Sequence, residues 1–325
     1  MRMIRVLALV LSALLLCACA AGAQDIPPRE TVDIHLDQLP VNDQGIPLLK
    51  VYVADEKKLE QMDVETYVQG VLAGEMKNDW PMEALKAQAI LARTFVLKFV
   101  QEKESRYKGA DISTDIEEAQ AYNASAVNSR IRQAVQETEG LVLVSGQQLP
   151  YAWFHAHSGG VTELAQAGLG WDRDEPTYTQ SVKGNEPQEA EDAQALRDAA
   201  SWEAHFSFEE LEAACAKQGV ETHVSADTQL SIGKRGESGR AVTLNIGNQT
   251  LQAAELRLAL GSTKMRSTLL TSLKTNETGV VMAGKGYGHG VGMSQWGAYG
   301  MAQSGRNAEQ IVTHYFQDAK VAQAW

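Results

Sequence analysis

Two consecutive helices separated by a proline-containing break constrain the fold of this chain more than any other stretch. Asp63 can cap a helix that runs to about Met76, and the residues from Asn78 to Pro81 then interrupt it. Pro81 suits the first turn of a second helix, which is predicted to continue to about Lys103. Because the break is short, the second helix can fold back on the first.

The second helix carries two cations inside an apolar arc. With 100° between successive residues, Lys86 and Arg93 fall between two groups of apolar side chains. The opposite face, which includes Ala87 and Thr94, is expected to meet water. One interpretation is that both cations lay their stems along the apolar edge and keep their charges solvated. The other is that they face a carboxylate or an anionic substrate.

Glu75 lies at the end of the first helix, within the sequence GVLAGEM. Tyr67, Val71 and Glu75 share one face at intervals of four residues, so the acid follows an apolar stripe. Glu75 can therefore pair with Lys86 or Arg93 as a structural ion pair. Alternatively, partial burial raises its pKa until it can donate a proton near neutral pH. The pattern leaves both interpretations open.

A third segment, AWFHAHSGGVTE, combines histidines with a tight turn. The preceding residues are predicted to form a hairpin that turns at Ser145 and Gly146. His155 and His157 then point to one face of a strand and could hold a metal ion. A hydrolase is disfavoured, because the sequence shows no nucleophile elbow and no acid placed to orient a histidine base. A strand end followed by a polar turn at Ser158 is the simpler alternative.

A fourth segment, GKGYGHGVGMSQWGAYGMAQSG, is rich in glycine. Six of the 15 residues from 286 to 300 are glycine, which lets the backbone approach another group closely. It lacks the GK[ST] ending of a phosphate-binding loop. Tyr287, His289 and Gln295 decorate it with the aromatic and amide groups that a carbohydrate groove uses. The alternative is a glycine-rich loop packed against the core.

Net charge excludes one class of partner. The 325 residues carry a formal charge of −12, so the chain is a poor candidate for binding duplex nucleic acid, where lysine and arginine contacts to phosphate supply most of the affinity. It is equally unsuited to coating an anionic lipid surface.

Residues 1–23 are typical of a secretory leader: two arginines, an apolar run and then small residues. Cys19 follows a leucine at −3 and an alanine at −1, as at a bacterial lipoprotein cleavage site, which predicts lipidation of Cys19. Ordinary cleavage after Ala20 or Ala23, or an uncleaved anchor, are alternatives. Each of them places the body of the protein outside the cytoplasm, as a membrane-anchored or secreted protein.

Helices and strands mix without a βαβ rhythm, so the expected class is α+β, with mixed helices and antiparallel strands around a substrate groove. After the leader, residues 24–47 are predicted to be a linker. Residues 48–325 are predicted to form the catalytic domain. Within it, alternating segments over 221–282 predict strands, and about 201–265 is predicted to be an inserted β-rich subdomain that walls the groove.

Four sequence words together resemble a known family. VETYVQGVLAGEM, WPMEALKAQAILART, YAWFHAHSGGVTE and GYGHGVGMSQWGAYGMAQSG occur in this order from about residue 48 to the C-terminus. They closely resemble the stage II sporulation protein D family, which also includes amidase enhancers.

The resemblance implies an extracytoplasmic peptidoglycan lytic transglycosylase. Such an enzyme cleaves glycan strands between N-acetylmuramic acid and N-acetylglucosamine, leaves 1,6-anhydro ends, and prefers strands denuded of stem peptides by a partner amidase. The family's catalytic glutamate maps onto Glu75. The predicted substrate-binding residues are Lys86, Arg93, Gln120, Tyr122, His155, Ser158, Gly159, Gly160, Tyr287, His289, Ser294 and Gln295.

One departure from the family concerns zinc. Some relatives carry a zinc-binding cysteine directly before a Gln-x-Tyr motif, whereas this chain has Ala119 before Gln120 and Tyr122. An alanine cannot bind zinc, so no zinc is predicted at that place and no cofactor is expected. Gln120 and Tyr122 are still expected to line the groove.

Three function classes follow from these observations. A transglycosylase needs only one carboxyl, because the C6 hydroxyl of the substrate replaces the water that hydrolysing glycosidases activate with a second carboxylate. A non-catalytic wall-binding protein that enhances an amidase would keep the groove without using Glu75 for bond cleavage. A metal hydrolase would depend on His155 and His157.

Overall fold

A computed structural model describes residues 29–34, 36 and 39–325. The predicted leader over residues 1–23, with its lipidation site at Cys19, lies outside the described residues. Residues 31–325 form one compact unit. None of the helices formed by the described residues combines the length and the apolar character needed to cross a bilayer.

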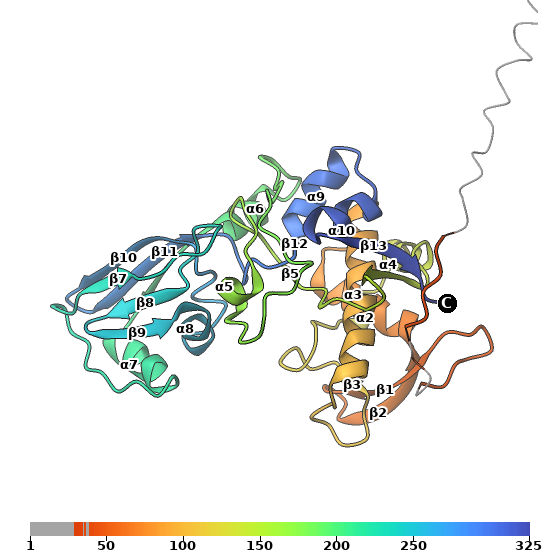
Figure 1. The fold of residues 1–325 in the computed structure, drawn as a ribbon, viewed down its shortest axis with the longest axis horizontal. Helices are drawn as coiled ribbons and strands as arrows, with labels where there is room; N and C mark the ends of the chain where they lie inside the picture. The colour runs from red at the N-terminus through yellow and green to blue at the C-terminus, as the bar shows by residue number, and fades with distance from the viewer. Residues whose placement is uncertain (1–28, 35, 37–38) are drawn as a thin grey trace, which may run out of the picture. The chain divides into compact units, whose positions relative to one another are not determined.

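The fold is α+β, as predicted: helices mix with small sheets whose strands are mostly antiparallel (Figure 1). The helices are α2 Val64–Glu75, α3 Met82–Glu102, α4 Ser129–Gln136, α5 Ala165–Leu169, α6 Ala193–Ala200, α7 Phe208–Ala216, α8 Ala253–Ala259, α9 Gln295–Gln303 and α10 Ala308–Tyr315. The strands are β1 Leu48–Val53, β2 Lys58–Asp63, β3 Ile112–Ser113, β4 Leu141–Ser145, β5 Phe154–His155, β6 Ser201–Phe206, β7 Leu230–Ile232, β8 Thr243–Ile246, β9 Gln249–Gln252, β10 Leu270–Asn276, β11 Gly279–Lys285, β12 Met293–Ser294 and β13 Ala319–Gln323.

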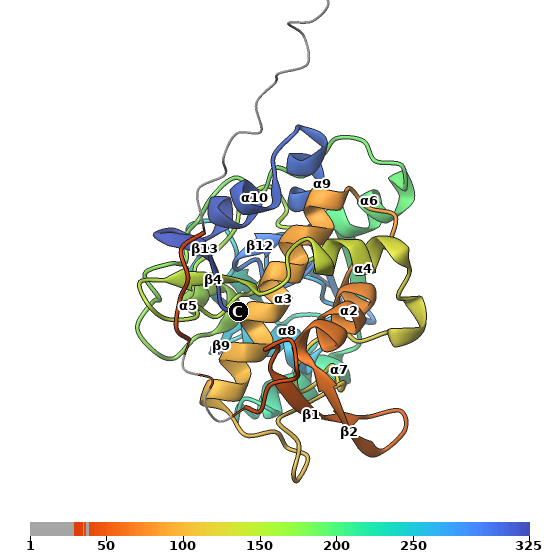
Figure 2. The same cartoon turned by 90° about the vertical axis from the view of Figure 1, so that its right-hand side faces the viewer.

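Helix α3 is the centre of the first hydrophobic core. Asp63 caps α2 as expected, accepting a hydrogen bond from the Thr66 amide, and the chain then turns back at Pro81 into α3. Helices α2, α4, α9 and α10 and strand β4 all contact α3, and Figure 2 shows it running among these helices. The face predicted to meet water is therefore covered: Ala87 and Thr94 are both fully buried.

Arg93 is fully buried in a bidentate ion pair with Glu65, which lies in the first turn of α2. Its Nε donates to Glu65 Oε1 at 2.9 Å and its Nη2 to Glu65 Oε2 at 2.5 Å. The guanidinium also donates to the Leu141 carbonyl, and the same carboxylate accepts from the Gly140 amide at 3.0 Å. One pair of charges thus fixes α2, α3 and the start of β4 relative to one another.

The prediction that Lys86 or Arg93 pairs with Glu75 is wrong, whereas their contact with a substrate stays a prediction. A carboxylate does face Arg93, but it stands at the start of α2 rather than at the end. Lys86 donates to Glu83 on its own helix at 2.8 Å and pairs with Glu137 just beyond α4. Both cations therefore form ion pairs between or within helices and do not contact the end of α2.

A second hydrophobic core overlaps the stretch predicted as an inserted subdomain and extends beyond it. It is built from two three-stranded sheets, β10-β11-β6 and β7-β8-β9, together with α7 and α8, which lie together in Figure 1. The predicted bounds of 201–265 are too narrow, because Leu270, Val280 and Met282 of the following hairpin belong to the same core.

Two local predictions are corrected by strand pairing. The turn predicted at Ser145–Gly146 is present, because Ser145 and Gln148 form an antiparallel bridge with two backbone hydrogen bonds. The strands on either side do not pair with each other, since β4 pairs with the C-terminal β13 and β5 pairs with β12. Residues 141–144 of β4 are buried although the sheet has only two strands, because α3 packs against it. Part of the predicted linker also packs: Ile34, Leu39 and Ile46 are buried.

We expect Arg93→Met to lower the free energy of unfolding by about 3–5 kcal/mol, because it leaves the Glu65 carboxylate buried without its countercharge. The double variant Glu65→Leu with Arg93→Met removes both charges and should recover most of that loss. Urea unfolding followed by circular dichroism measures both variants.

The control for this experiment is Lys58→Met, which removes an exposed cation from its pairs with Glu56 and Glu60 and should hardly change the unfolding midpoint. A double variant as unstable as Arg93→Met alone would contradict the assignment of the loss to an unpaired charge.

Candidate active site

Two glycines on α2 allow another segment to pass directly against the helix. A side chain at Gly74 would begin 2.7 Å from the backbone of Ala121 and Tyr122, and one at Gly70 would overlap the Tyr122 ring. The end of α2 and residues 121–122 are therefore in direct backbone contact. This contact explains why glycines stand at positions 70 and 74.

The carboxyl of Glu75 is held by this neighbouring segment. The Ala121 amide donates to Glu75 Oε1 at 2.7 Å, and Gln295 Nε2 donates to the Glu75 carbonyl at 3.3 Å. Burial raises the pKa of Glu75 to about 7 and outweighs the hydrogen bonds from Ala121 and Gln295, which act in the opposite direction. Near neutral pH the carboxyl is therefore divided between its protonated and ionised forms.

Glu75 opens into a pocket of about 450 Å³. Its walls come from the end of α2, from residues 116–120, from residues around β5 and from the glycine-rich segment. The pocket brings together six of the predicted site residues: Glu75, Gln120, His155, Tyr287, His289 and Gln295. The pocket also has an apolar part that was not predicted. It is formed by Phe95, Ile116, Ala152, Trp153, Phe154 and Ala156.

The two pocket histidines differ in what they can offer a ligand. His155 Nδ1 lies 3.1 Å from the Val291 carbonyl, so Nδ1 carries the proton, and its buried Nε2 has no partner among the described residues. His289 Nδ1 instead accepts from the Val291 amide at 3.0 Å. Burial lowers the pKa of both rings, which are 5.6 Å apart. His155 is therefore neutral, and its Nε2 is a buried acceptor without a partner among the described residues.

The predicted residues Ser158, Gly159, Gly160 and Ser294 do not line this pocket. The Ser158 amide and the Ser294 hydroxyl both donate to Glu186 Oε1 at 2.7 Å. Gly159 and Gly160 have φ values of 75° and 118°, which the tight turn requires. Ser158 and Ser294 thus join β5 and β12 through Glu186, while Gly159 and Gly160 line a neighbouring hollow. Substrate contact by these four residues stays a prediction.

Tyr122 is also placed differently from the prediction. Its ring packs on Gly70 and lies 5.6 Å from the ring of Tyr67. Tyr122 thus covers the flank of α2, whereas its neighbour Gln120 lines the pocket.

Arg240 of the second core fixes the backbone behind the pocket. It is fully buried, and its guanidinium donates to the Ser158 carbonyl at 2.5 Å and to the Val161 carbonyl at 2.9 Å. A side chain at Gly290 would collide with the guanidinium. The sequence analysis singled out neither Arg240 nor Glu186, because both stand among ordinary polar residues and no periodicity distinguishes them from surface charges.

The described residues contain no group of three or more histidine, cysteine, aspartate or glutamate side chains that could hold a metal ion. Ala119, at the position where some relatives have a zinc-binding cysteine, lines the pocket beside Gln120. The two histidines predicted to hold a metal ion have different surroundings. His155 lines the pocket, whereas His157 Nδ1 accepts a hydrogen bond from the Gly159 amide at 2.9 Å.

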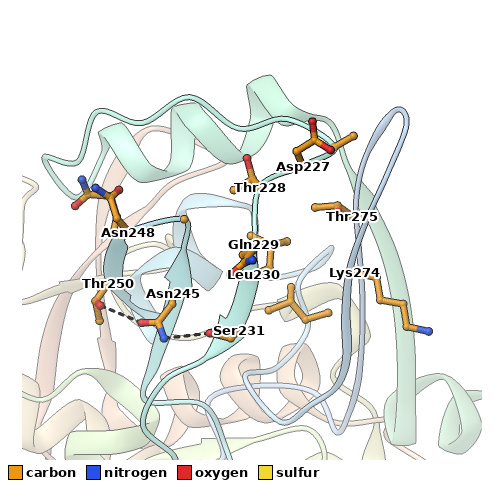
Figure 3. A pocket seen from close by; sticks show the side chains of 14 residues that line it. Asp227, Thr228, Gln229, Leu230, Ser231, Asn245, Asn248, Thr250, Lys274 and Thr275 are labelled. Carbon is orange, nitrogen blue, oxygen red and sulfur yellow. Dashed lines mark hydrogen bonds between the residues drawn. The ribbon is translucent and has the colours of Figure 1, made fainter.

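A separate hollow of about 820 Å³ lies on the second core, beside β7, β8 and β10 (Figure 3). Its polar side chains bond mainly to one another: Asn245 donates to Ser231 at 3.1 Å and accepts from Thr250 at 3.0 Å. Its lining includes neither histidine nor an aromatic ring. It therefore offers no stacking platform for a sugar.

Comparison with known proteins identifies relatives over most of the chain. The family model described as "Stage II sporulation protein" matches residues 52–144, and one described as "Domain of unknown function (DUF8618)" matches residues 170–292. The chain is 32% identical to the stage II sporulation protein D of Bacillus amyloliquefaciens, over 84% of this chain and 78% of the relative. It is 30% identical to the protein of the same name in Bacillus subtilis (strain 168), over 85% and 79%.

A more distant relative carries a different name. The amidase enhancer of Bacillus subtilis (strain 168) is 26% identical over 77% of this chain, which spans only 39% of that relative's length.

Fold and pocket define an α+β protein with one partly buried carboxyl at the end of a helix, facing an apolar pocket with amide and imidazole groups. The similarity over most of the chain gives the family: the chain belongs to the stage II sporulation protein D family.

The raised pKa of Glu75 makes stability depend on pH in a defined direction. The Glu75 carboxyl binds its proton more tightly in the folded protein than in the unfolded chain. It therefore stabilises the fold at pH values below its pKa in the unfolded chain, and this contribution is lost as pH rises through about 7. Glu75→Gln stays neutral, so it should be more stable than wild type at about pH 8, by up to about 3 kcal/mol. The difference should vanish near pH 4, as urea unfolding at several pH values can measure.

Glu102→Gln is the matched control, because Glu102 also ends a helix. Although burial opposes them, hydrogen bonds from Lys98 and Tyr151 hold the pKa of Glu102 below its usual value. Removing that charge should cost stability at about pH 8 rather than add to it. Equal stability of Glu75→Gln and wild type from about pH 4 to 8 would contradict the raised pKa of Glu75.

Proposed function

We propose that this protein is an extracytoplasmic peptidoglycan lytic transglycosylase in which Glu75 is the single catalytic acid and base. The observation that carries the proposal is the position of Glu75: a partly buried carboxyl with a pKa of about 7 that opens into a pocket. A general acid works best when its pKa lies near the operating pH, because it is then protonated often enough and releases its proton readily.

The reaction needs no second carboxylate. Glu75 donates its proton to the O4 of N-acetylglucosamine as the bond from C1 of N-acetylmuramic acid breaks. The C6 hydroxyl of the same muramic acid then bonds to C1, and its proton passes to Glu75. The products are a free O4 hydroxyl and a 1,6-anhydro end, and Glu75 is protonated again without consumption of water. The pocket lining agrees with this, because it contains no carboxyl besides Glu75.

The neighbouring groups suit this sequence of proton transfers. The Ala121 amide fixes one carboxyl oxygen of Glu75, and Gln295 ties the Glu75 backbone to the glycine-rich segment. His155 is neutral and offers an acceptor for a sugar hydroxyl without competing as an acid. Tyr287 and the apolar walls supply flat surface for a sugar face.

The cellular setting is proposed from the relatives. Proteins named stage II sporulation protein D and amidase enhancer favour peptidoglycan glycan strands as substrate, with a cell-wall amidase as partner that removes stem peptides. A leader over residues 1–23, with Cys19 as a lipid anchor, would place the domain outside the cytoplasm at the membrane. No cofactor is required by this chemistry.

A second function is favoured by the name of the amidase enhancer relative. A non-catalytic wall-binding protein would use the same pocket to hold a glycan for an amidase. It would differ from the enzyme in one respect: the Glu75 carboxyl would not be needed for any bond cleavage.

We expect Glu75→Gln to abolish release of 1,6-anhydro-muramyl products from amidase-treated peptidoglycan, because the amide cannot donate the proton that the leaving oxygen needs. For the wild type, activity should fall as pH rises above about 7, since the ionised carboxyl cannot start the reaction. Mass spectrometry of the released sugars gives both results.

Glu102→Gln, at the end of α3 and outside the pocket, is the control and should retain activity. If wild-type protein releases no anhydro product, or Glu75→Gln releases as much as wild type, the enzyme proposal fails and the enhancer function takes its place.

A further inference from the structure

Gln88 is a fully buried polar side chain in the first half of α3. The residues that share its face of the helix, Leu85, Leu91 and Ala92, are apolar and equally buried. Its Nε2 has no hydrogen-bond partner among the described residues. Because a buried donor without a partner makes the folded state less favourable, stability alone does not account for a carboxamide at this position.

The other atom of the Gln88 carboxamide contacts Gln295, the first residue of α9. Gln295 Nε2 donates to Gln88 Oε1 at 3.5 Å and to the Glu75 carbonyl at 3.3 Å. Both protons of that amide group are therefore directed at protein acceptors. The three residues stand on α3, α9 and α2, so these two hydrogen bonds join the central helix to the end of α2 through Gln295.

The two acceptors determine which way round the Gln295 carboxamide lies. If it turned over, its Oε1 would face two other oxygens, Gln88 Oε1 and the Glu75 carbonyl, and like partial charges repel each other. Since Gln295 lines the pocket, its Oε1 is the atom left for a ligand. An apolar side chain in place of Gln88 would remove one of the two acceptors that set this orientation.

The Gln295 amide also acts on the Glu75 carboxyl. A hydrogen bond from it lowers the pKa of Glu75, against the larger effect of burial. The other titratable side chains around the carboxyl are two histidines and two tyrosines: His155, His289, Tyr67 and Tyr287. Burial lowers the pKa of both histidines and raises that of Tyr67, so these three groups are neutral near pH 7. The orientation of one amide therefore matters for this acid.

We propose that Gln88 is a positioning residue, which holds the Gln295 carboxamide with its N–H groups towards the end of α2 and its oxygen towards the pocket. Gln88 is not among the residues that line the pocket, so it acts through Gln295. The use of this arrangement in bond cleavage rests on the proposed function, whereas the arrangement and its effect on Glu75 do not. A core residue that leaves a donor unpaired in order to orient a pocket amide gives up stability for function.

Gln88→Met distinguishes this role from a purely structural one. Methionine has a similar length but offers no carbonyl oxygen, so Gln295 becomes free to turn over. We expect the titration midpoint of Glu75 to rise by about 0.5–1 pH unit, because the ionised carboxyl loses a steady hydrogen bond. NMR titration of ¹³C-labelled glutamate carboxyls measures this midpoint, with Glu75→Gln to assign the signal.

Unfolding by urea gives the second readout for the same variant. At about pH 5 the Glu75 carboxyl is protonated in the folded protein, so its titration does not disturb the comparison. The urea midpoint of Gln88→Met should equal or exceed that of wild type, because the unpaired buried donor has been removed.

A double variant tests whether Gln88 acts through Gln295. In Gln295→Met the amide is already absent, so adding Gln88→Met should not move the Glu75 midpoint further. Gln101→Met is the matched control, because Gln101 also belongs to α3 but donates to the Ile34 carbonyl. It should leave the titration of Glu75 unchanged.

Three results overturn the proposal. The first is an unchanged Glu75 midpoint in Gln88→Met, and the second is an equal rise when Gln88→Met is added to Gln295→Met. The third is a large fall of the urea midpoint in both Gln88→Met and Gln88→Leu, because the carboxamide would then serve the fold.

Cleavage assays separate this inference from the proposed function. If wild type releases anhydro products, Gln88→Met should keep its activity to higher pH, by the same interval as the titration midpoint rises. Cleavage by wild type together with an unchanged Glu75 midpoint in Gln88→Met overturns the role of Gln88 and leaves the transglycosylase standing. A raised midpoint in a protein that cleaves no glycan leaves the role of Gln88 standing and removes the transglycosylase.

Discussion

The buried pair of Arg93 and Glu65 sets the frame on which the pocket depends. Two charges removed from water are tolerated only where their geometry is good and their remaining donors and acceptors are satisfied. Here the bidentate contact and the bonds to Leu141 and Gly140 meet that condition. Because Glu65 begins α2 and Glu75 ends it, anchoring the first fixes where the second emerges, about 15 Å further along the helix axis.

The pocket depends equally on residues from the second core. Arg240 bonds the backbone that leads away from β5, and it abuts Gly290 in the glycine-rich segment. The two segments that supply His155 and His289 are thereby held by a side chain far from both in sequence. The second core therefore supports the pocket from behind its backbone and contributes none of the lining side chains.

Four features could be predicted from the sequence: the helix pair, its break at Pro81, the α+β class and six pocket residues. They could be predicted because periodicity, capping and family motifs are local signals. The sequence did not show whether Arg93 is buried or lies at the solvent-exposed edge of the apolar arc, because the helical pattern is the same for both positions. Only the tertiary structure brings Glu65 to Arg93 as its partner. For the same reason Ser158 and Ser294 were expected in the groove. Their motif is genuine, yet their polar groups turn to Glu186, which no pattern singled out.

Strand pairing also has a consequence for the order in which this protein can mature. Strand β4 finds its partner only in β13, at residues 319–323, and α3 is covered by the C-terminal helices α9 and α10. Tyr287, His289 and Gln295 likewise arrive late in the chain. A growing chain that has not reached Gln295 therefore lacks part of the pocket, and contacts of such long sequence separation form slowly. Until those late residues pack against it, the Glu75 carboxyl lacks the burial that raises its pKa.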